Sequence, residues 1–194
     1  MKYSLDLSWK TPKAWAEQAI TNMDDFLIDH ADCERKASSM CMSFVAKCPD
    51  KIEMIPELID TALEELEHFK MVYKIMEERG IRLPDRMPQD QYIHQLINEC
   101  RSGRDDRLMD RMLIASIVEV RGAERFRLVA EELEEGELKK FYKFLWTSEA
   151  KHGNLFVSLA LKYWDENSVL KRLKELNEKE GEIMSKMPFR PALH

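Results

Sequence analysis

The amino-acid sequence predicts an all-α protein built on a four-helix bundle. Apolar residues recur every three to four positions over four long stretches, which is the pattern of helices that bury one face. No stretch alternates between apolar and polar residues as a half-buried strand does. A Glu-x-x-His phrase also occurs twice, as Glu65 to His68 and as Glu149 to His152. On a helix this spacing places a carboxylate and an imidazole on one face, and facing helices of a bundle build metal sites in this way.

Length and composition indicate one acidic domain over residues 1–194. The net charge is −6 and the pI is near 5.5, which argues against a protein that coats nucleic acid generally but leaves room for a local basic patch. The four cysteines show neither a Cys-x-x-Cys pair nor zinc-ribbon spacing. Since no stretch reaches the roughly 18 uninterrupted apolar residues of a membrane span, we expect a cytoplasmic protein without a membrane partner.

The first half of the chain predicts a short N-terminal helix and a long helical hairpin. Thr11-Pro12 is typical of a helix start, with the hydroxyl residue as N-cap and proline in the first helical position. Pro49 stops the first arm of the hairpin and Gly80 ends the second. The segment after Gly80 contains two prolines and predicts a crossover connection between two hairpins. The expected ranges are 11–21 for the short helix, 24–47 and 52–79 for the arms, and 81–89 for the crossover.

The second half predicts another hairpin, with a short helix before it and a longer one after it. Ser102-Gly103 separates the short helix from the third long helix, and Gly136 marks the turn between the arms. The last helix is charged and amphipathic, so we expect it to cover the bundle. The expected ranges are 91–100, 105–134, 137–164 and 168–187.

Both Glu-x-x-His phrases lie within apolar stripes, so Glu65, His68, Glu149 and His152 should face a core. A buried carboxylate costs several kcal/mol unless something compensates its charge, and a metal ion pairs naturally with carboxylate and imidazole together. In the four-helix carboxylate pattern, two further helices each add one Glu, and the six ligands hold two irons. Glu34 is the candidate in the first arm, because the turn at Pro49 lies midway between Glu34 and Glu65.

The third long helix offers two candidates for the remaining ligand, Glu119 and Glu124, each on a largely apolar face. Glu119 precedes Glu149 by nearly the spacing that separates Glu34 from Glu65, which an internal duplication of the hairpin would explain. The turn at Gly136 is more nearly equidistant from Glu124 and Glu149. We favour Glu119, and expect Glu124 to support the site by pairing with Arg121, Arg125 or Arg127.

These phrases resemble those of known proteins. The set of four glutamates and two histidines resembles the ferritin-like di-iron proteins as a group. Four longer phrases are similar to those of the tRNA hydroxylase family called MiaE: His30-Ala-Asp-Cys-Glu34-Arg-Lys-Ala, Glu64-Glu65-Leu-Glu-His68-Phe, Glu119-Val-Arg-Gly-Ala-Glu124-Arg-Phe126 and Ser148-Glu149-Ala-Lys-His152-Gly. The resemblance extends from about Leu5 to Met187, and the Glu119 to Phe126 phrase is its most specific part.

The resemblance implies an activity and its requirements. A MiaE-like enzyme would be a non-haem di-iron monooxygenase that uses O2 to hydroxylate the isopentenyl group of 2-methylthio-N6-isopentenyladenosine, the modified base beside the anticodon of tRNA. Electrons would come from a separate reductase or ferredoxin, because the sequence contains no flavin or nicotinamide motif. We expect a monomer or homodimer. The alternatives are other ferritin-like di-iron or di-manganese proteins, namely a ferroxidase or iron-storage protein, a peroxidase or a catalase. A non-enzymatic alternative is a helical interaction module in which the Glu-x-x-His phrases only form buried salt bridges.

RNA contact in an acidic protein would have to be local. Four arginines cluster across the start of the third long helix, and we take them as candidates for binding phosphates: Arg101, Arg104, Arg107 and Arg111. Three lysines at the start of the fourth long helix would belong to the same phosphate-binding rim: Lys139, Lys140 and Lys143. A solvated charged helix face would give the same pattern.

Overall fold

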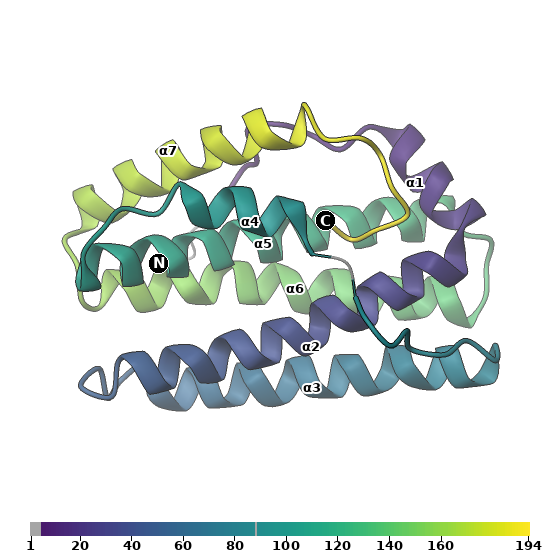
Figure 1. The fold of residues 1–194 in the computed structure, drawn as a ribbon, viewed down its shortest axis with the longest axis horizontal. Helices are drawn as coiled ribbons and strands as arrows, with labels where there is room; N and C mark the ends of the chain where they lie inside the picture. The colour runs from purple at the N-terminus through teal and green to yellow at the C-terminus, as the bar shows by residue number, and fades with distance from the viewer. Residues whose placement is uncertain (1–4, 88) are drawn as a thin grey trace. The chain divides into compact units, whose positions relative to one another are not determined.

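The computed structural model describes residues 5–87 and 89–194, and within these residues it consists of helices without strands. The predicted all-α class is therefore confirmed. The helices are α1 (Lys13–Thr21), α2 (Met23–Lys47), α3 (Ile55–Glu78), α4 (Gln91–Asn98), α5 (Arg104–Glu132), α6 (Glu137–Leu161) and α7 (Glu166–Met184) (Figure 1). Each expected helix is present, and its ends lie within three residues of the expected ones. Pro88, one of the two prolines of the expected crossover, lies outside the described residues.

The chain divides into two compact units. The first takes in residues 5–17 and 89–190 together with His194, and so contains α4 to α7. The second takes in residues 18–87 and 191–193, and so contains α2 and α3. The expectation of a single domain over residues 1–194 stays a prediction.

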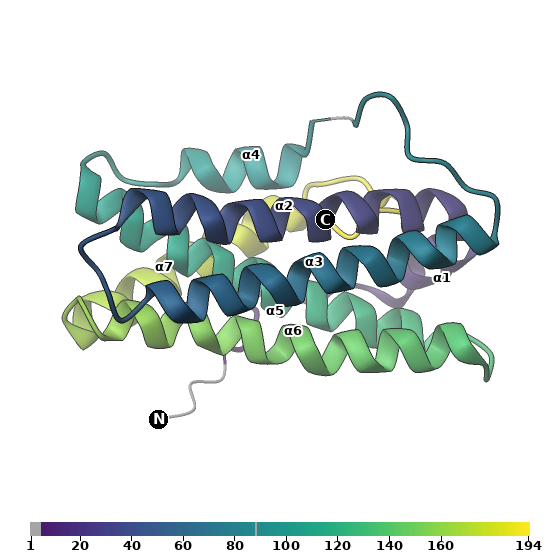
Figure 2. The ribbon, with the colours of Figure 1, turned by 90° about the horizontal axis from the view of Figure 1, so that it is seen from below.

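The second unit is an antiparallel hairpin of α2 and α3, which lie side by side in both views (Figures 1 and 2). Halfway along it, Ser38 Oγ donates a hydrogen bond of 2.8 Å to the carbonyl oxygen of Ala62. At its far end, Arg79 Nη2 lies 2.6 Å from Asp24 Oδ1. Gly80 follows with φ of 71°, the left-handed conformation that ends a helix. These contacts fix how far α3 is shifted along α2.

The hairpin of α5 and α6 is the centre of the first unit. Gly153 on α6 lets the two helices approach closely, because a Cβ there would lie 2.5 Å from Val120 Cγ2 on α5. Beside this contact, the Ser116 hydroxyl donates a short hydrogen bond to the Gly153 carbonyl oxygen. The rings of Phe126 and Tyr142 also pack across the hairpin, with centroids 5.6 Å apart. A small residue and a buried hydroxyl thus set the register of α5 against α6.

Helices α4 and α7 pack against α5 within the first unit (Figure 1). Leu173 and Leu176 are buried in a core cluster that also contains Leu113 and Ile117, which agrees with the expected covering role of the last helix. The residues before α1 lie on α7, where Ser8 Oγ donates a 2.6 Å hydrogen bond to the Asn177 carbonyl oxygen.

One detail of the predicted helix starts is wrong. Helix α1 begins at Lys13 rather than at Pro12. The Thr11 hydroxyl, expected to cap this helix, instead donates a 2.7 Å hydrogen bond to Glu124 Oε2 on α5. The carboxylate of Glu124, 113 residues further along the chain, thus accepts the hydrogen bond of the expected capping group.

Candidate metal centre

In the second unit, the α2–α3 hairpin gathers three predicted ligands, which we call the α2–α3 trio: Glu34, Glu65 and His68. All three are buried. Their ligand atoms lie within 4.8 Å of one another. His68 Nδ1 is 3.4 Å from Glu65 Oε2 and 3.7 Å from Glu34 Oε2. The three side chains therefore point at one place, as their helical spacing predicts.

His30 holds one member of this trio in position. It lies one turn before Glu34 on α2 and is fully buried, and its Nε2 is 2.7 Å from Glu34 Oε1. A neutral imidazole that donates this hydrogen bond fixes the direction of the carboxylate. The orienting role of His30 was not predicted from the sequence, although the four-residue spacing between His30 and Glu34 was a signal for it.

In the first unit, the α5–α6 hairpin gathers a matching set, the α5–α6 trio: Glu119, Glu149 and His152. These residues are also buried, and their ligand atoms lie within 4.8 Å of one another. His152 Nδ1 is 3.1 Å from Glu149 Oε2. The close contact of Val120 with Gly153 lies directly beside this trio in sequence, so the same register that packs the helices aligns Glu119 with Glu149.

Glu124, the other candidate on α5, is engaged elsewhere in the first unit. Its Oε2 accepts hydrogen bonds from the Thr11 hydroxyl and, over a short distance, from Arg121 Nη1. Arg121 is fully buried and also donates to both carboxylate oxygens of Glu180 on α7, at 2.8 Å each. Because Glu180 binds this cation, the pKa of Arg121 lies above its ordinary value even though burial alone would lower it. Glu124 and Arg121 thus form a network that ties α5 to α7.

The donors of each trio fit a hard metal ion. Each trio offers two carboxylates and one imidazole, which are the groups that bind iron and manganese in proteins. The carboxylate oxygen and the Nδ1 atom of each Glu-x-x-His pair lie 3.4 Å and 3.1 Å apart. Since metal bonds to these atoms are about 2 Å long, one ion can contact both members of a pair.

The four arginines predicted to contact RNA differ in their surroundings. Arg101 is bound to the fully buried Asp110, with Nη2 at 2.7 Å from Oδ1, and Arg172 of α7 binds the same carboxylate. Burial would raise the pKa of Asp110, but the hydrogen bonds from the two arginines outweigh it and lower that pKa. Arg111 is half-buried, whereas Arg104 and Arg107 are exposed. Arg101 therefore neutralises the buried Asp110 in addition to any contact with RNA.

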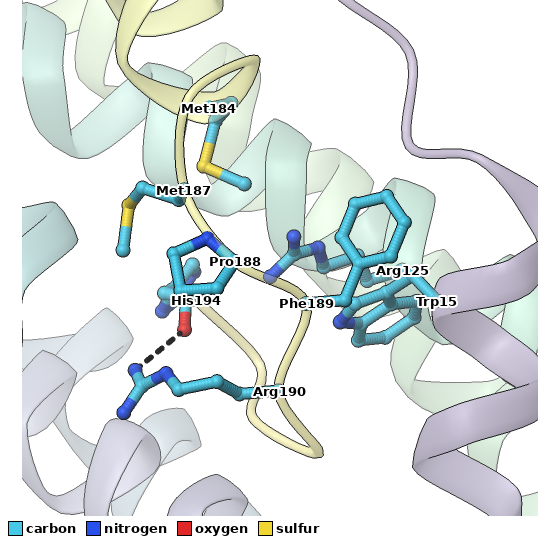
Figure 3. A pocket seen from close by; sticks show the side chains of 8 residues that line it. All are labelled: Trp15, Arg125, Met184, Met187, Pro188, Phe189, Arg190 and His194. Carbon is cyan, nitrogen blue, oxygen red and sulfur yellow. Dashed lines mark hydrogen bonds between the residues drawn. The ribbon is translucent and has the colours of Figure 1, made fainter.

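The segment after α7 folds over part of the first unit. With Trp15, Arg125 and Met184 it encloses a cavity whose other lining residues are Met187, Pro188, Phe189, Arg190 and His194 (Figure 3). The enclosed space is about that of one water molecule, so this cavity is too small to accept a nucleoside.

Burial lowers the pKa of Arg125 to about 10, and the positive charge of Arg121 acts in the same direction.

None of the helices in the described ranges has the length and apolar character needed to cross a membrane.

Comparison with known proteins identifies the family. A family model described as tRNA-(MS2IO6A)-hydroxylase (MiaE) matches residues 3–194. A curated tRNA 2-(methylsulfanyl)-N(6)-isopentenyladenosine(37) hydroxylase from Pseudomonas putida is 33% identical, over 92% of this chain and 86% of its own. The protein of the same name from Salmonella typhimurium is 24% identical, over 90% of this chain and 82% of its own.

A solved structure shares the fold. It is described as protein 43 with aldehyde deformylating oxygenase activity from Synechococcus, and it matches with a TM-score of 0.91 at 31% identity, over 97% of this chain and 94% of its own. The predicted ferritin-like fold is thereby confirmed. With the family model matching nearly every residue and a third of the positions identical to a curated member, this chain belongs to the MiaE family of tRNA hydroxylases.

Proposed function

We propose that the two trios together bind two iron ions. The protein uses these irons to hydroxylate the isopentenyl group of 2-methylthio-N6-isopentenyladenosine in tRNA. The observation that carries this proposal is the pair of buried trios, each with two glutamates and one histidine. Membership of a family of tRNA hydroxylases supports the substrate.

Charge balance favours two divalent ions. Four buried carboxylates carry four negative charges, and two ferrous ions would compensate all of them, whereas buried carboxylates without compensation would cost several kcal/mol each. The ligands would be Glu34, Glu65, His68, Glu119, Glu149 and His152. When bound, the irons supply the activation of O2.

The protein's own residues prepare the site. His30 orients Glu34, and the contact between Gly153 and Val120 orients the α5–α6 trio. Fully buried apolar side chains near the ligands on the same helices, such as Ala31 and Phe156, exclude water from their surroundings. A dry site protects a strong oxidant from side reactions.

The remaining requirements are external. Electrons come from a reductase or ferredoxin, O2 is the co-substrate, and the protein works in the cytoplasm as a monomer or homodimer. The exposed Arg104 and Arg107 contact tRNA phosphates near the start of α5. Replacing both by Ala should weaken tRNA binding and reduce its salt dependence, and unchanged binding would remove these residues from the interface.

A second candidate has a specific observation in its favour. The similar solved structure is described as having aldehyde deformylating oxygenase activity, so the same fold accommodates another O2-dependent reaction. Aldehyde deformylation is therefore a competing function to test. The others are the alternatives that the sequence left open: ferroxidase or storage activity, peroxidase activity and manganese catalase activity.

The test begins with protein from iron-supplemented cells. Metal analysis should give close to two irons per chain, and Mössbauer spectroscopy should show that they are coupled. The protein should then hydroxylate tRNA that carries the isopentenyl base when a reductant and O2 are supplied, and it should leave an aldehyde unchanged. Two manganese ions, or turnover of the aldehyde alone, would contradict the proposal.

A further inference from the structure

Helix α6 differs from every other helix of the described residues in its charge. It carries four lysines against two glutamates, whereas no other helix has more basic than acidic residues. One of the two glutamates, Glu149, is buried with the trio, so Glu137 is the one carboxylate of the helix itself that is exposed beside the lysines. A basic helix in a protein of net charge −6 indicates a negatively charged partner.

Two exposed aromatic residues lie among these lysines. Phe144 is 51% exposed and Trp146 is 39% exposed. The spacing of Lys140, Phe144, Thr147 and Lys151 places them in one line along the helix, and Lys143 lies one turn before Trp146. We call these six residues the α6 outer face: Lys140, Lys143, Phe144, Trp146, Thr147 and Lys151. Glu149 and His152 lie on the buried side of the same helix.

The lysines differ in their availability. Lys140 is paired with Glu137 at 2.7 Å, and Lys139 at the edge of the face is paired with Glu135 at 3.1 Å. Lys143 and Lys151 are exposed and form no ion pair with any residue that the structure describes. Lys143 directly precedes Phe144 in the sequence, and Lys151 lies two turns after Phe144 on the same line of the helix.

We propose that the α6 outer face binds the single-stranded loop of the tRNA that presents the substrate base. The inference rests on the proposed function for its RNA partner. Lys143 and Lys151 contact phosphates, while unpaired bases stack on Phe144 and Trp146, which is how proteins recognise unpaired RNA without reading a groove. A duplex offers no unstacked bases, so this combination favours a loop.

The position on α6 relates the binding face to the chemistry. A helix with its side chains is about 10–12 Å across. A nucleotide stacked on the outer face therefore lies about one helix width from Glu149 and His152. A neighbouring nucleotide turned out of the loop can then present its prenyl group toward the buried side.

Binding of a fluorescent anticodon stem-loop that carries the modified adenosine tests the proposal. The substitutions Lys143→Ala and Lys151→Ala together should weaken binding about tenfold at low salt. They should also reduce the slope of log K against log salt by about 1.4, the value for two contacts to single-stranded phosphates. Phe144→Ala should weaken binding by about tenfold at every salt concentration with the slope unchanged, since stacking releases no counterions. As a matched control, Lys171→Ala and Lys174→Ala on α7 should leave binding unchanged.

The outcomes separate this inference from the proposed function. In one outcome, the Lys143→Ala, Lys151→Ala double variant and the Phe144→Ala variant bind RNA as tightly as the original protein while keeping its helix content and iron content. That result would refute binding of tRNA at the α6 outer face, even if the protein hydroxylates tRNA. If the substitutions weaken the binding of a blunt RNA duplex by the same factor, unpaired bases do not stack on Phe144 and Trp146. If the variants lose binding as expected but the original protein hydroxylates no tRNA, the proposed function fails and the docking surface stands.

Discussion

Gly153 and Val120 face each other so closely that a single methyl group on Gly153 would lie 2.5 Å from Val120 Cγ2. Val120 is β-branched and has little rotamer freedom in a helix, so it cannot turn away. His152 precedes Gly153 and Glu119 precedes Val120. The contact that packs α5 on α6 is therefore next to two proposed ligands.

Gly153→Ala should destabilise the protein by about 1–3 kcal/mol, because it overpacks this contact. It should also lower the iron content, since the displaced helices carry Glu119 and His152. Thermal unfolding and metal analysis measure the two effects. Adding Val120→Ala should recover part of both losses, and a variant Gly153→Ala that is as stable as the original protein would show that the helices have room to separate.

His30→Gln should weaken iron binding by about 10–100-fold, the usual effect of removing a residue that orients a metal ligand. The physical reason is the 2.7 Å contact between His30 Nε2 and Glu34 Oε1, which a glutamine does not reproduce in the same direction. Competition with a chelator gives the affinity. His94 is exposed, so His94→Gln is a matched control that should bind iron normally. Equal affinities for the two variants would refute the orienting role.

Arg121→Met should cost about 3–5 kcal/mol of unfolding free energy, because it leaves the fully buried carboxylate of Glu180 without its cation. Glu180→Gln should cost less. The amide still accepts the hydrogen bond that Tyr92 donates to Glu180, and Arg121 retains Glu124 as a partner. Urea unfolding measures both, and equal losses would mean that charge is not the dominant contribution.

Stability should fall as the pH is lowered from about 6.5 toward 4. Burial lowers the pKa of His194 to about 4, and the positive charge of Arg125 acts in the same direction. The unfolded chain therefore takes up a proton below about pH 6.5 that the folded protein does not bind. Because His194 is only half-buried, solvent screening limits the loss of unfolding free energy to about 1–2 kcal/mol. Unfolding at a series of pH values measures it. His194→Gln should flatten this part of the profile, and an unchanged profile would assign it to other groups.

The sequence predicted the structure correctly wherever the contacts that fix it lie within one helix or one hairpin. The Glu-x-x-His spacing predicted that each glutamate and histidine share a face, and the position of Pro49 predicted that Glu34 and Glu65 lie at the same height. Local signals such as Gly80 and Gly136 also located the helix ends within three residues. These features depend on helical geometry, which the spacing of residues expresses directly.

Contacts between distant segments were beyond the reach of sequence patterns. Glu119 and Glu124 both lie on apolar faces of α5, and what distinguishes their surroundings is Thr11, which is 113 residues from Glu124. The pairing of Arg121 with Glu180 spans 59 residues. Asp110 lies in a run of charged residues that reads as solvated, yet it is fully buried between Arg101 and Arg172. Buried ionic networks of this kind have no periodic signature.

The division of the six candidate ligands into two trios has a consequence for how the protein folds. Each trio is assembled by a helical hairpin with a short turn, so its members meet through contacts that are local along the chain. Local contacts form early because little loop entropy is lost in closing them. During synthesis, the α2–α3 trio is complete once residue 78 has emerged, before any residue of the α5–α6 trio has emerged. The order of synthesis thus favours a nascent chain that presents one finished set of metal donors before the other set leaves the ribosome.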